Sequence, residues 1–217
     1  MKKLISEFIG TYALVFAGTG AIVVNTITSG AVSHLGIALT FGLVVMVMIY
    51  AMGDVSGAHF NPAVTLGFWI AKRFPGNKVL PYILSQSLGA LLASLTIKFL
   101  FFSPSTLGET MPIGAVSQSF VLEIILTFFL MYVILAVSSG AKEKGVTAGI
   151  VIGAVVALDA LFGGPISGAS MNPARSLGPA FISGNIQFLW IYMIAPVVGA
   201  WMAVIACRCS QNNNCCT

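Results

Sequence analysis

The sequence predicts an all-α membrane protein in which six transmembrane helices and two re-entrant half-helices form an inverted 3+3 repeat. Of the 217 residues, 58% are hydrophobic and only 7% are charged, a composition outside the range of soluble domains. Six apolar stretches are about 18 to 25 residues long, the length that an α-helix needs to cross about 30 Å of hydrocarbon. A motif of twelve residues also occurs twice, after the second apolar stretch and after the fifth.

The apolar stretches run approximately over residues 4–27, 34–52, 79–101, 117–138, 144–162 and 186–206. Their continuity argues against a β-barrel, whose strands are short segments of alternating hydrophobicity. The first stretch follows two lysines, as the hydrophobic part of a signal peptide would. It is too long for a signal peptide, however, contains Glu7 and lacks a convincing cleavage site before the next span. We therefore expect it to remain as the first transmembrane helix.

Most basic residues fall on one side of the membrane when the six spans are drawn in this way. They are Lys2, Lys3, Lys72, Arg73, Lys78, Lys142, Lys144 and Arg208. The positive-inside rule places this side in the cytoplasm, so we expect a multi-pass protein of the cell membrane with both termini cytoplasmic. The net charge of +4 then reflects topology, and we predict no nucleic-acid partner. Lys98 lies near the outer end of its span and can reach the interface, whereas Arg175 needs another explanation.

The repeated motif reads SGAHFNPAVTLG at Ser56 to Gly67 and SGASMNPARSLG at Ser167 to Gly178, with identity at eight of twelve positions. In each copy Asn precedes Pro and a short apolar stretch, and this order is typical of a helix start. We expect half-helices over 61–72 and 172–182, which enter from opposite faces and meet at the midplane. Irregular backbone at that depth is tolerated only if it is buried in protein or lines a watery path.

The repeat extends beyond this motif. Glu7 and Glu123 each lie near the start of a unit of three spans, and Thr11 and Thr127 follow them at the same distance of four residues. Two such units inserted from opposite sides form an inverted repeat. We therefore expect one pore-forming domain with half-repeats at 1–102 and 117–206, an extracellular linker at 103–116 and a cytoplasmic tail at 207–217.

These features resemble the aquaporin family, also called major intrinsic proteins. The resemblance rests on two Asn-Pro-Ala boxes, each in an SGA-x-x-NPA context, within six spans and with a glutamate early in each half. It covers essentially the whole chain and implies a homotetramer with one pore per protomer. The segment LFGGPISGASMNPARSLGPA is similar to the nodulin-like intrinsic proteins of plants and their bacterial relatives.

The two boxes predict a barrier to charge at the midplane; they are Asn61, Pro62, Ala63 and Asn172, Pro173, Ala174. Two half-helix N-termini would place about half a positive charge each at this point. Asn61 and Asn172 would donate to the oxygen of a passing water or hydroxyl, and an oxygen that accepts from both cannot continue a proton-conducting chain. The alternative is that the asparagines only cap the half-helices.

Arg175 stands where the first copy of the motif has Val64. An arginine inside a membrane protein is costly unless it is paired or faces a water-filled cavity. The resemblance implies that Arg175 lines an outer constriction with Phe41, Ala160 and Ala169. Strict water channels of the family usually have histidine at the position of Ala160, so the two alanines predict a wider filter with one aromatic wall. The alternative is an arginine that is tied only to buried carbonyls.

The resemblance predicts passive conduction of water and small uncharged solutes. Glycerol facilitators usually have aspartate after the arginine, whereas this chain has Ser176. The nodulin-like subfamily includes channels for water, glycerol, ammonia and metalloid hydroxides, so we expect glycerol-like polyols or metalloid hydroxides to pass with water. A strict water channel is the alternative. A secondary transporter would need a coupling carboxylate near the boxes, and neither box has one. Intact Asn61, Asn172 and Arg175 argue against a non-conducting scaffold.

Other polar residues have two readings each. Glu7 and Glu123 resemble the buried acids of the family, which accept hydrogen bonds from backbone amides of the re-entrant loops. Asp159 either faces the lumen and supports the filter arginine or binds loop backbone. Asp54 is expected in a solvated loop, and His59 either lines the cytoplasmic vestibule or packs as a satisfied histidine.

The four cysteines all lie in the expected tail, as Cys207, Cys209, Cys215 and Cys216. A cytoplasmic location argues against structural disulfides, and these spacings without a nearby histidine do not make a standard zinc site. We expect a disordered tail without function; binding of a thiophilic ion or acylation are the alternatives.

No nucleophile, metal-ligand cluster or phosphate loop supports an enzyme, so we predict no catalytic residues, no metal and no cofactor.

Overall fold

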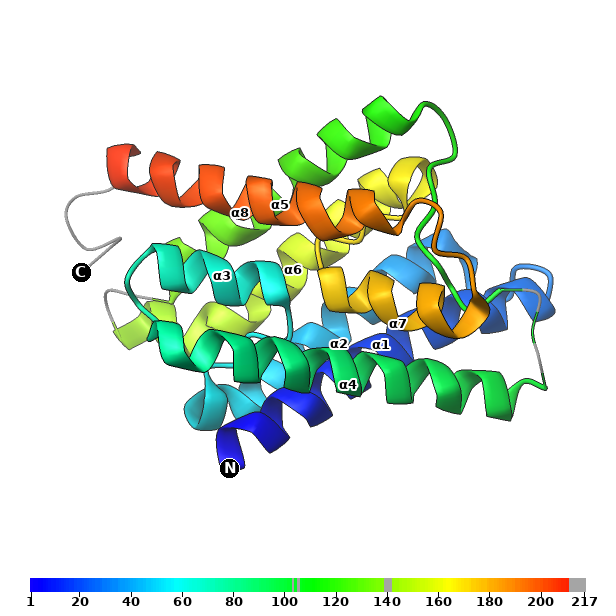
Figure 1. Cartoon of the computed structure of the whole chain (residues 1–217), viewed down its shortest axis with the longest axis horizontal. Coiled ribbons are helices and arrows are strands. Elements are labelled where there is room, and N and C mark those ends of the chain that lie inside the picture. Colours follow the sequence, from blue (N-terminus) through cyan, green and yellow to red (C-terminus); the bar gives the residue numbers. More distant parts are fainter. Residues whose placement is uncertain (103, 105, 139–141, 211–217) are drawn as a thin grey trace.

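The computed structural model describes residues 1–102, 104, 106–138 and 142–210, and these form α-helices joined by loops (Figure 1). Among the described residues, six helices are long and apolar enough to cross a membrane. They are α1 (Lys2–Ile27), α2 (Ser33–Ser56), α4 (Val79–Leu100), α5 (Val116–Val137), α6 (Lys142–Ser167) and α8 (Leu189–Ser210). Two helices are short, α3 (Pro62–Ile70) and α7 (Pro173–Ser183), and a 3₁₀ turn, η1 (Gly76–Lys78), precedes α4.

The all-α membrane fold predicted from the sequence is confirmed, and the differences are at helix ends. α2 continues to Ser56, so Asp54 lies on a helix instead of in the expected loop, and Gly57 ends this helix with a φ of 89°, a conformation that glycine adopts readily. α8 continues to Ser210, so Cys207 and Cys209 are helical, whereas Cys215 and Cys216 lie outside the described residues. Apolar length marks only the membrane-crossing part of a helix, while its hydrogen bonds continue into polar sequence.

The two halves of the chain pack by the same scheme. α1 packs on α4 in the first half, and α5 packs on α8 in the second. At both crossings a glycine lies against the main chain of its partner. A Cβ on Gly89 would overlap the carbonyl oxygen of Phe8, and a Cβ on Gly199 would overlap that of Ile124. Small residues of this kind let membrane helices approach closely. α2 packs on α6 and so joins the halves.

The short helices α3 and α7 lie among the long ones with their N-terminal ends facing each other near the middle of the bundle (Figure 1). α3 packs on α8 and α7 packs on α4. Each short helix therefore contacts the last long helix of the opposite half. This exchange brings the two copies of the repeated motif together at the centre.

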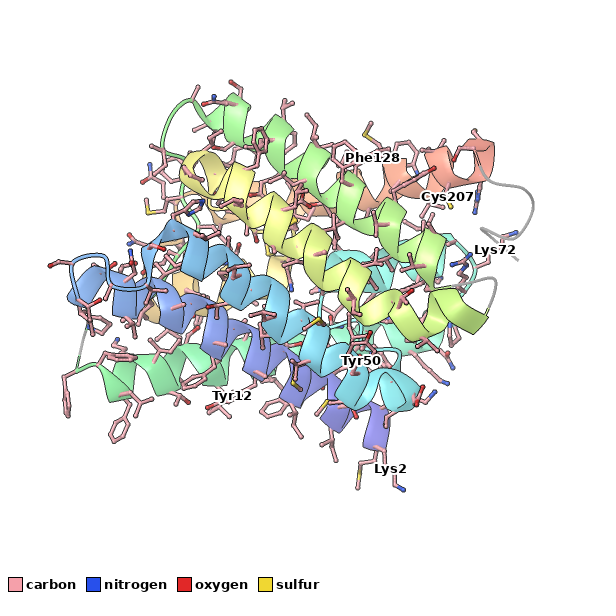
Figure 2. The ribbon with its side chains drawn as sticks, turned by 180° about the vertical axis from the view of Figure 1, so that it is seen from behind. Lys2, Tyr12, Tyr50, Lys72, Phe128 and Cys207 are labelled. Carbon is pink, nitrogen blue, oxygen red and sulfur yellow. The ribbon has the colours of Figure 1, made fainter. Side chains whose placement is uncertain are left out.

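The outer surface of the bundle is apolar, with exposed leucine and valine side chains such as Leu43, Val47 and Leu84 on its long helices. Figure 2 shows Lys2, Lys72 and Cys207 at one end of the bundle, which we call the basic end. An apolar belt over helices of this length is the surface of an integral, multi-pass membrane protein.

Candidate functional site

Both short helices begin at an Asn-Pro-Ala box, at Asn61, Pro62, Ala63 and at Asn172, Pro173, Ala174. Oδ1 of Asn61 accepts a hydrogen bond from the N–H of Ala63 at 2.8 Å, and Oδ1 of Asn172 accepts one from the N–H of Ala174 at 3.0 Å. These caps satisfy N–H groups that have no partner in the first helical turn. Proline fits the next position because no donor is needed there.

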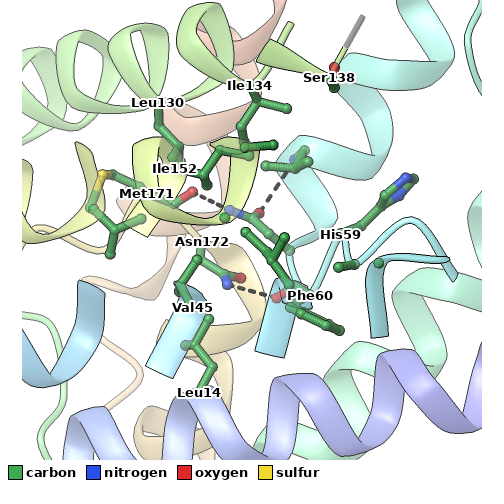
Figure 3. Close-up of a pocket in the computed structure, with 18 of the residues that line it drawn as sticks. Leu14, Val45, His59, Phe60, Leu130, Ile134, Ser138, Ile152, Met171 and Asn172 are labelled. Carbon is green, nitrogen blue, oxygen red and sulfur yellow. Dashed lines mark hydrogen bonds between the residues drawn. The ribbon is translucent and has the colours of Figure 1, made fainter. Parts of the chain in front are cut away.

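The same two asparagines also join the two re-entrant loops. Nδ2 of Asn61 donates to the carbonyl oxygen of Met171 at 2.8 Å, and Nδ2 of Asn172 donates to that of Phe60 at 2.9 Å (Figure 3). Each bond uses one of the two hydrogens on an amide nitrogen. Each asparagine thus caps its own helix with its oxygen and holds the opposite loop with its nitrogen.

Glu7 anchors the first loop. Its carboxylate accepts hydrogen bonds from Oγ of Ser56 at 2.7 Å, from the N–H of His59 at 3.0 Å and from the N–H of Phe60 at 2.8 Å. Nε2 of Gln86 donates to it at 2.8 Å. The side chain of Glu7 is fully buried, and these donors replace the water that burial removes.

Glu123 anchors the second loop in the same manner. It accepts from Oγ of Ser167 at 2.7 Å, from the N–H of Ser170 at 2.9 Å and from the N–H of Met171 at 2.8 Å. Because both acids take up the loop N–H groups, the carbonyl oxygens of these loops are left to face other partners.

The described residues surround a cavity of about 640 Å³. Its apolar wall includes Leu14 of α1, Val45 of α2, Leu130 of α5 and Ile152 of α6 (Figure 3). The two box asparagines line it, and Tyr50 and Asp54 line it near the end of α2. One cavity therefore passes both copies of the motif.

All four residues expected in the filter line this cavity; they are Phe41, Ala160, Ala169 and Arg175. Cζ of Arg175 lies 5.1 Å from the centroid of the Phe41 ring, a cation–π distance. Gly18 makes room for the ring, because a Cβ there would overlap it. Only 2% of Arg175 is exposed, and within the described part of the chain its Nε has no hydrogen-bond partner.

The linker between the halves folds over Arg175, a feature that sequence reasoning missed. The carbonyl oxygen of Gly108 accepts a hydrogen bond from Nη1 of Arg175 at 2.7 Å. Oγ1 of Thr110 lies 2.7 Å from Oγ of Ser176, the residue that follows the arginine. Gly108 and Thr110 are buried, so this part of the expected extracellular linker is packed into the protein.

Glu109 holds this part of the linker in shape. Its Oε2 accepts from Oγ1 of Thr106 at 2.6 Å and from the N–H of Leu107 at 3.1 Å. Burial raises the pKa of Glu109, but hydrogen bonds from Thr106, Ser183 and backbone N–H groups outweigh burial and leave it below the ordinary value of 4.5. The ionised carboxylate is therefore the form that the loop stabilises.

The structure combines the two readings of His59, whereas among the described residues it bears out neither reading of Asp159. His59 lines the cavity and is also packed, with Nδ1 3.1 Å from Oγ1 of Thr65 and its ring stacked on Phe68. Asp54 is exposed on α2 and lines the cavity. Asp159 is only 1% exposed and is not among the cavity-lining residues. Its Oδ2 has no hydrogen-bond partner among the described groups.

The chain is similar in sequence and in fold to known proteins. It matches the family model described as Major intrinsic protein over residues 1–207. It is 49% identical over 201 residues to Aquaporin NIP1-1 of Zea mays, covering 92% of this chain and 71% of that protein. It is 48% identical over 201 residues to Nodulin-26 of Glycine max, covering 92% and 74%. The X-ray structure of the aquaglyceroporin from Plasmodium falciparum is similar with a TM-score of 0.83 and 29% identity, covering 93% of both chains.

Proposed function

Because the chain belongs to the major intrinsic protein family, we propose that it is a passive channel for water and small uncharged solutes that excludes ions and protons. The observation that carries this proposal is the cavity of about 640 Å³, which is lined by Arg175, by both box asparagines and by Asp54. The resemblance to aquaporins and to their nodulin-like members, which the sequence alone suggested, is confirmed by these relatives. The family consists of channels, and we propose no enzymatic activity.

The barrier to charge lies at the two boxes and at Arg175. The N-terminal ends of α3 and α7 each direct about half a positive charge toward the middle of the cavity. The second amide hydrogens of Asn61 and Asn172 are donors for a passing oxygen, which then cannot relay a proton along a water chain. The buried guanidinium of Arg175 adds a full positive charge beside Phe41. A neutral solute gains hydrogen bonds here, whereas a cation is repelled.

Phe41, Ala160, Ala169 and Arg175 form the proposed selectivity filter. The two alanines offer little bulk opposite the aromatic ring, so the opening admits molecules wider than water. Arg175 lines the cavity beside Phe41, and its guanidinium carries N–H donors for the oxygen of a hydroxyl solute. We propose glycerol-like polyols or metalloid hydroxides as these solutes. The similarity to an aquaporin and to an aquaglyceroporin supports the polyol part of this range.

Ala160→His tests the solute range. Histidine narrows the filter, so we expect glycerol permeability to fall about fivefold or more while water permeability changes less than about twofold, since a contact of this size is worth about 1 kcal/mol. The measurement is stopped-flow light scattering of proteoliposomes with glycerol, urea, boric acid and arsenite. Ala154→His is the matched control, because Ala154 is exposed on the same helix and does not line the cavity.

Two results of this assay would contradict the proposal. Wild-type vesicles that pass water but none of the larger solutes would indicate a strict water channel. Equal losses of water and glycerol permeability in Ala160→His would remove Ala160 from the filter.

We also propose a homotetramer in the lipid bilayer of the cell membrane, with both termini cytoplasmic. The basic end of the bundle supports this orientation by the positive-inside rule. Exposed apolar side chains on the long helices supply surface for lipid and for neighbouring protomers. Protease protection of tagged termini in sealed vesicles tests the orientation, and the mass of the detergent-solubilised protein by light scattering tests the assembly.

A further inference from the structure

Pro165 interrupts the hydrogen bonding of α6 close to the proposed filter residue Ala160. It lies inside the helix and has no N–H to donate to the residue four positions earlier, Leu161. The side chains of Leu158, Leu161 and Phe162 are exposed, so this turn belongs to the apolar outer surface of the bundle. An unpaired carbonyl is costly in such surroundings, so the carbonyl of Leu161 needs another donor.

His34, in the first turn of α2, supplies this donor. Its Nε2 lies 2.8 Å from the carbonyl oxygen of Leu161, across 127 positions of the sequence. A carbonyl oxygen only accepts, so Nε2 must carry a hydrogen. Gly164 leaves space for the imidazole ring, because a Cβ at this position would lie 2.8 Å from Cε1 of His34. The ring therefore fits into the turn that Pro165 interrupts.

Several close contacts join α2 and α6, and two of them flank the proposed filter residues; the bond from His34 is the outer of these two. The inner contact is at Gly42, where a Cβ would lie 2.5 Å from the carbonyl oxygen of Gly153. Eight residues of each helix separate the two contacts, 34 to 42 and 153 to 161, which corresponds to about 12 Å of helix. Phe41 adjoins the inner contact and Ala160 adjoins the outer one. The two proposed filter residues therefore lie between these contacts.

We propose that His34 is a positioning residue for the selectivity filter: its Nε2–H replaces the N–H that Pro165 lacks and thereby fixes Ala160 relative to Phe41. The inference rests on the proposed function, since it assigns His34 a part in the width of that filter. His34 does not line the cavity, so it acts on solutes only through the position of α6.

The test compares four variants in proteoliposomes. His34→Phe keeps a planar ring and removes the donor, and we expect the ratio of glycerol to water permeability to change about fivefold, the effect of about one hydrogen bond. His34→Gln retains an N–H near the position of Nε2 and should keep the wild-type ratio. Pro165→Ala restores the main-chain donor to Leu161, so the double variant His34→Phe/Pro165→Ala should recover the wild-type ratio, as should Pro165→Ala alone.

Each outcome decides the inference. An unchanged ratio in His34→Phe, or a changed ratio that Pro165→Ala does not recover, overturns it. If wild-type vesicles pass no glycerol, the proposed solute range fails, and the same variants are then compared by water permeability and by thermal unfolding in detergent. Under the inference, His34→Phe lowers water permeability and the unfolding temperature in the wild-type background but not in the Pro165→Ala background. Equal effects in both backgrounds overturn it.

Discussion

The loop before α3 and the loop before α7 are held by equivalent hydrogen bonds, but different parts of the protein surround them. In each half a buried glutamate binds two loop N–H groups and a serine hydroxyl. In each half a tyrosine also holds the carbonyl of that serine, with Tyr82 2.8 Å from Ser56 and Tyr192 2.7 Å from Ser167. These shared contacts explain how two loops of different sequence meet symmetrically at the midplane.

The differences between the loops are as specific as the shared contacts. Val64 follows the first box and Arg175 follows the second. Four residues after the matching tyrosines, the first half has Gln86 and the second half has Pro196. Within the described residues, the linker is bonded to the second box region, where Arg175 of α7 donates to Gly108. The symmetric contacts thus support the barrier that we propose at the boxes, while the selectivity that we propose depends on contacts found in one half.

Replacement of Glu7 or Glu123, the acids that anchor the two loops, should reveal the largest difference between the two halves. Glu123→Gln places an amide N–H₂ against loop N–H groups, and we expect it to lower the free energy of unfolding by about 2–4 kcal/mol. Glu7→Gln should cost less, about 1–2 kcal/mol, because Gln86 can turn its amide. Oε1 of Gln86 is buried without a partner among the described groups and would accept from the new amide.

Unfolding of the two detergent-solubilised variants, followed by circular dichroism, measures this difference. The two variants serve as controls for each other, since the substitution is the same. Equal losses, or a larger loss for Glu7→Gln, would show that Gln86 does not compensate.

Arg175→Val makes the second loop resemble the first, with Val64 as its model. Removal of the guanidinium takes a full positive charge from the filter, so we expect proton or cation leak to rise about tenfold, equivalent to about 1.4 kcal/mol. A pH-sensitive dye inside proteoliposomes measures the leak. Lys98→Val is the control, because Lys98 is exposed on α4 and does not line the cavity. Unchanged leak in Arg175→Val would exclude Arg175 from the barrier.

The smallest effect should be the response of the linker to acid. The lowered pKa of Glu109 means that its bonds contribute fully above its ordinary value of 4.5 and are lost as the pH falls through the lowered value. Solute selectivity should therefore stay constant between about pH 7 and about pH 5 and change only in stronger acid. Glu109→Gln should show the altered selectivity at every pH. A change of solute selectivity near neutral pH that persists in Glu109→Gln would show that another group, and not Glu109, causes it.

The prediction of both short helices from the sequence depended on local chemistry. Asn61 and Asn172 cap helices that start with proline, and these caps lie within three residues of their partners. The repeat then related the two halves without any knowledge of contacts. Sequence reasoning placed Asp54 in a loop, because apolar length ends before the hydrogen bonds of α2 do. It gave no role to Gln86 or Tyr82, whose partners lie far away in the chain.

The sequence by itself determined the membrane spans, the inverted repeat and the residue types that line the centre, because helix length, capping and repetition are local properties. Only the tertiary structure decided which main-chain groups the key side chains meet. The carbonyl oxygen of Gly108 accepts a hydrogen bond from Arg175, 67 positions away. That of Leu161 accepts one from His34, 127 positions away. A backbone carbonyl is the same in every residue, so neither of these acceptors can be recognised from its place in the sequence.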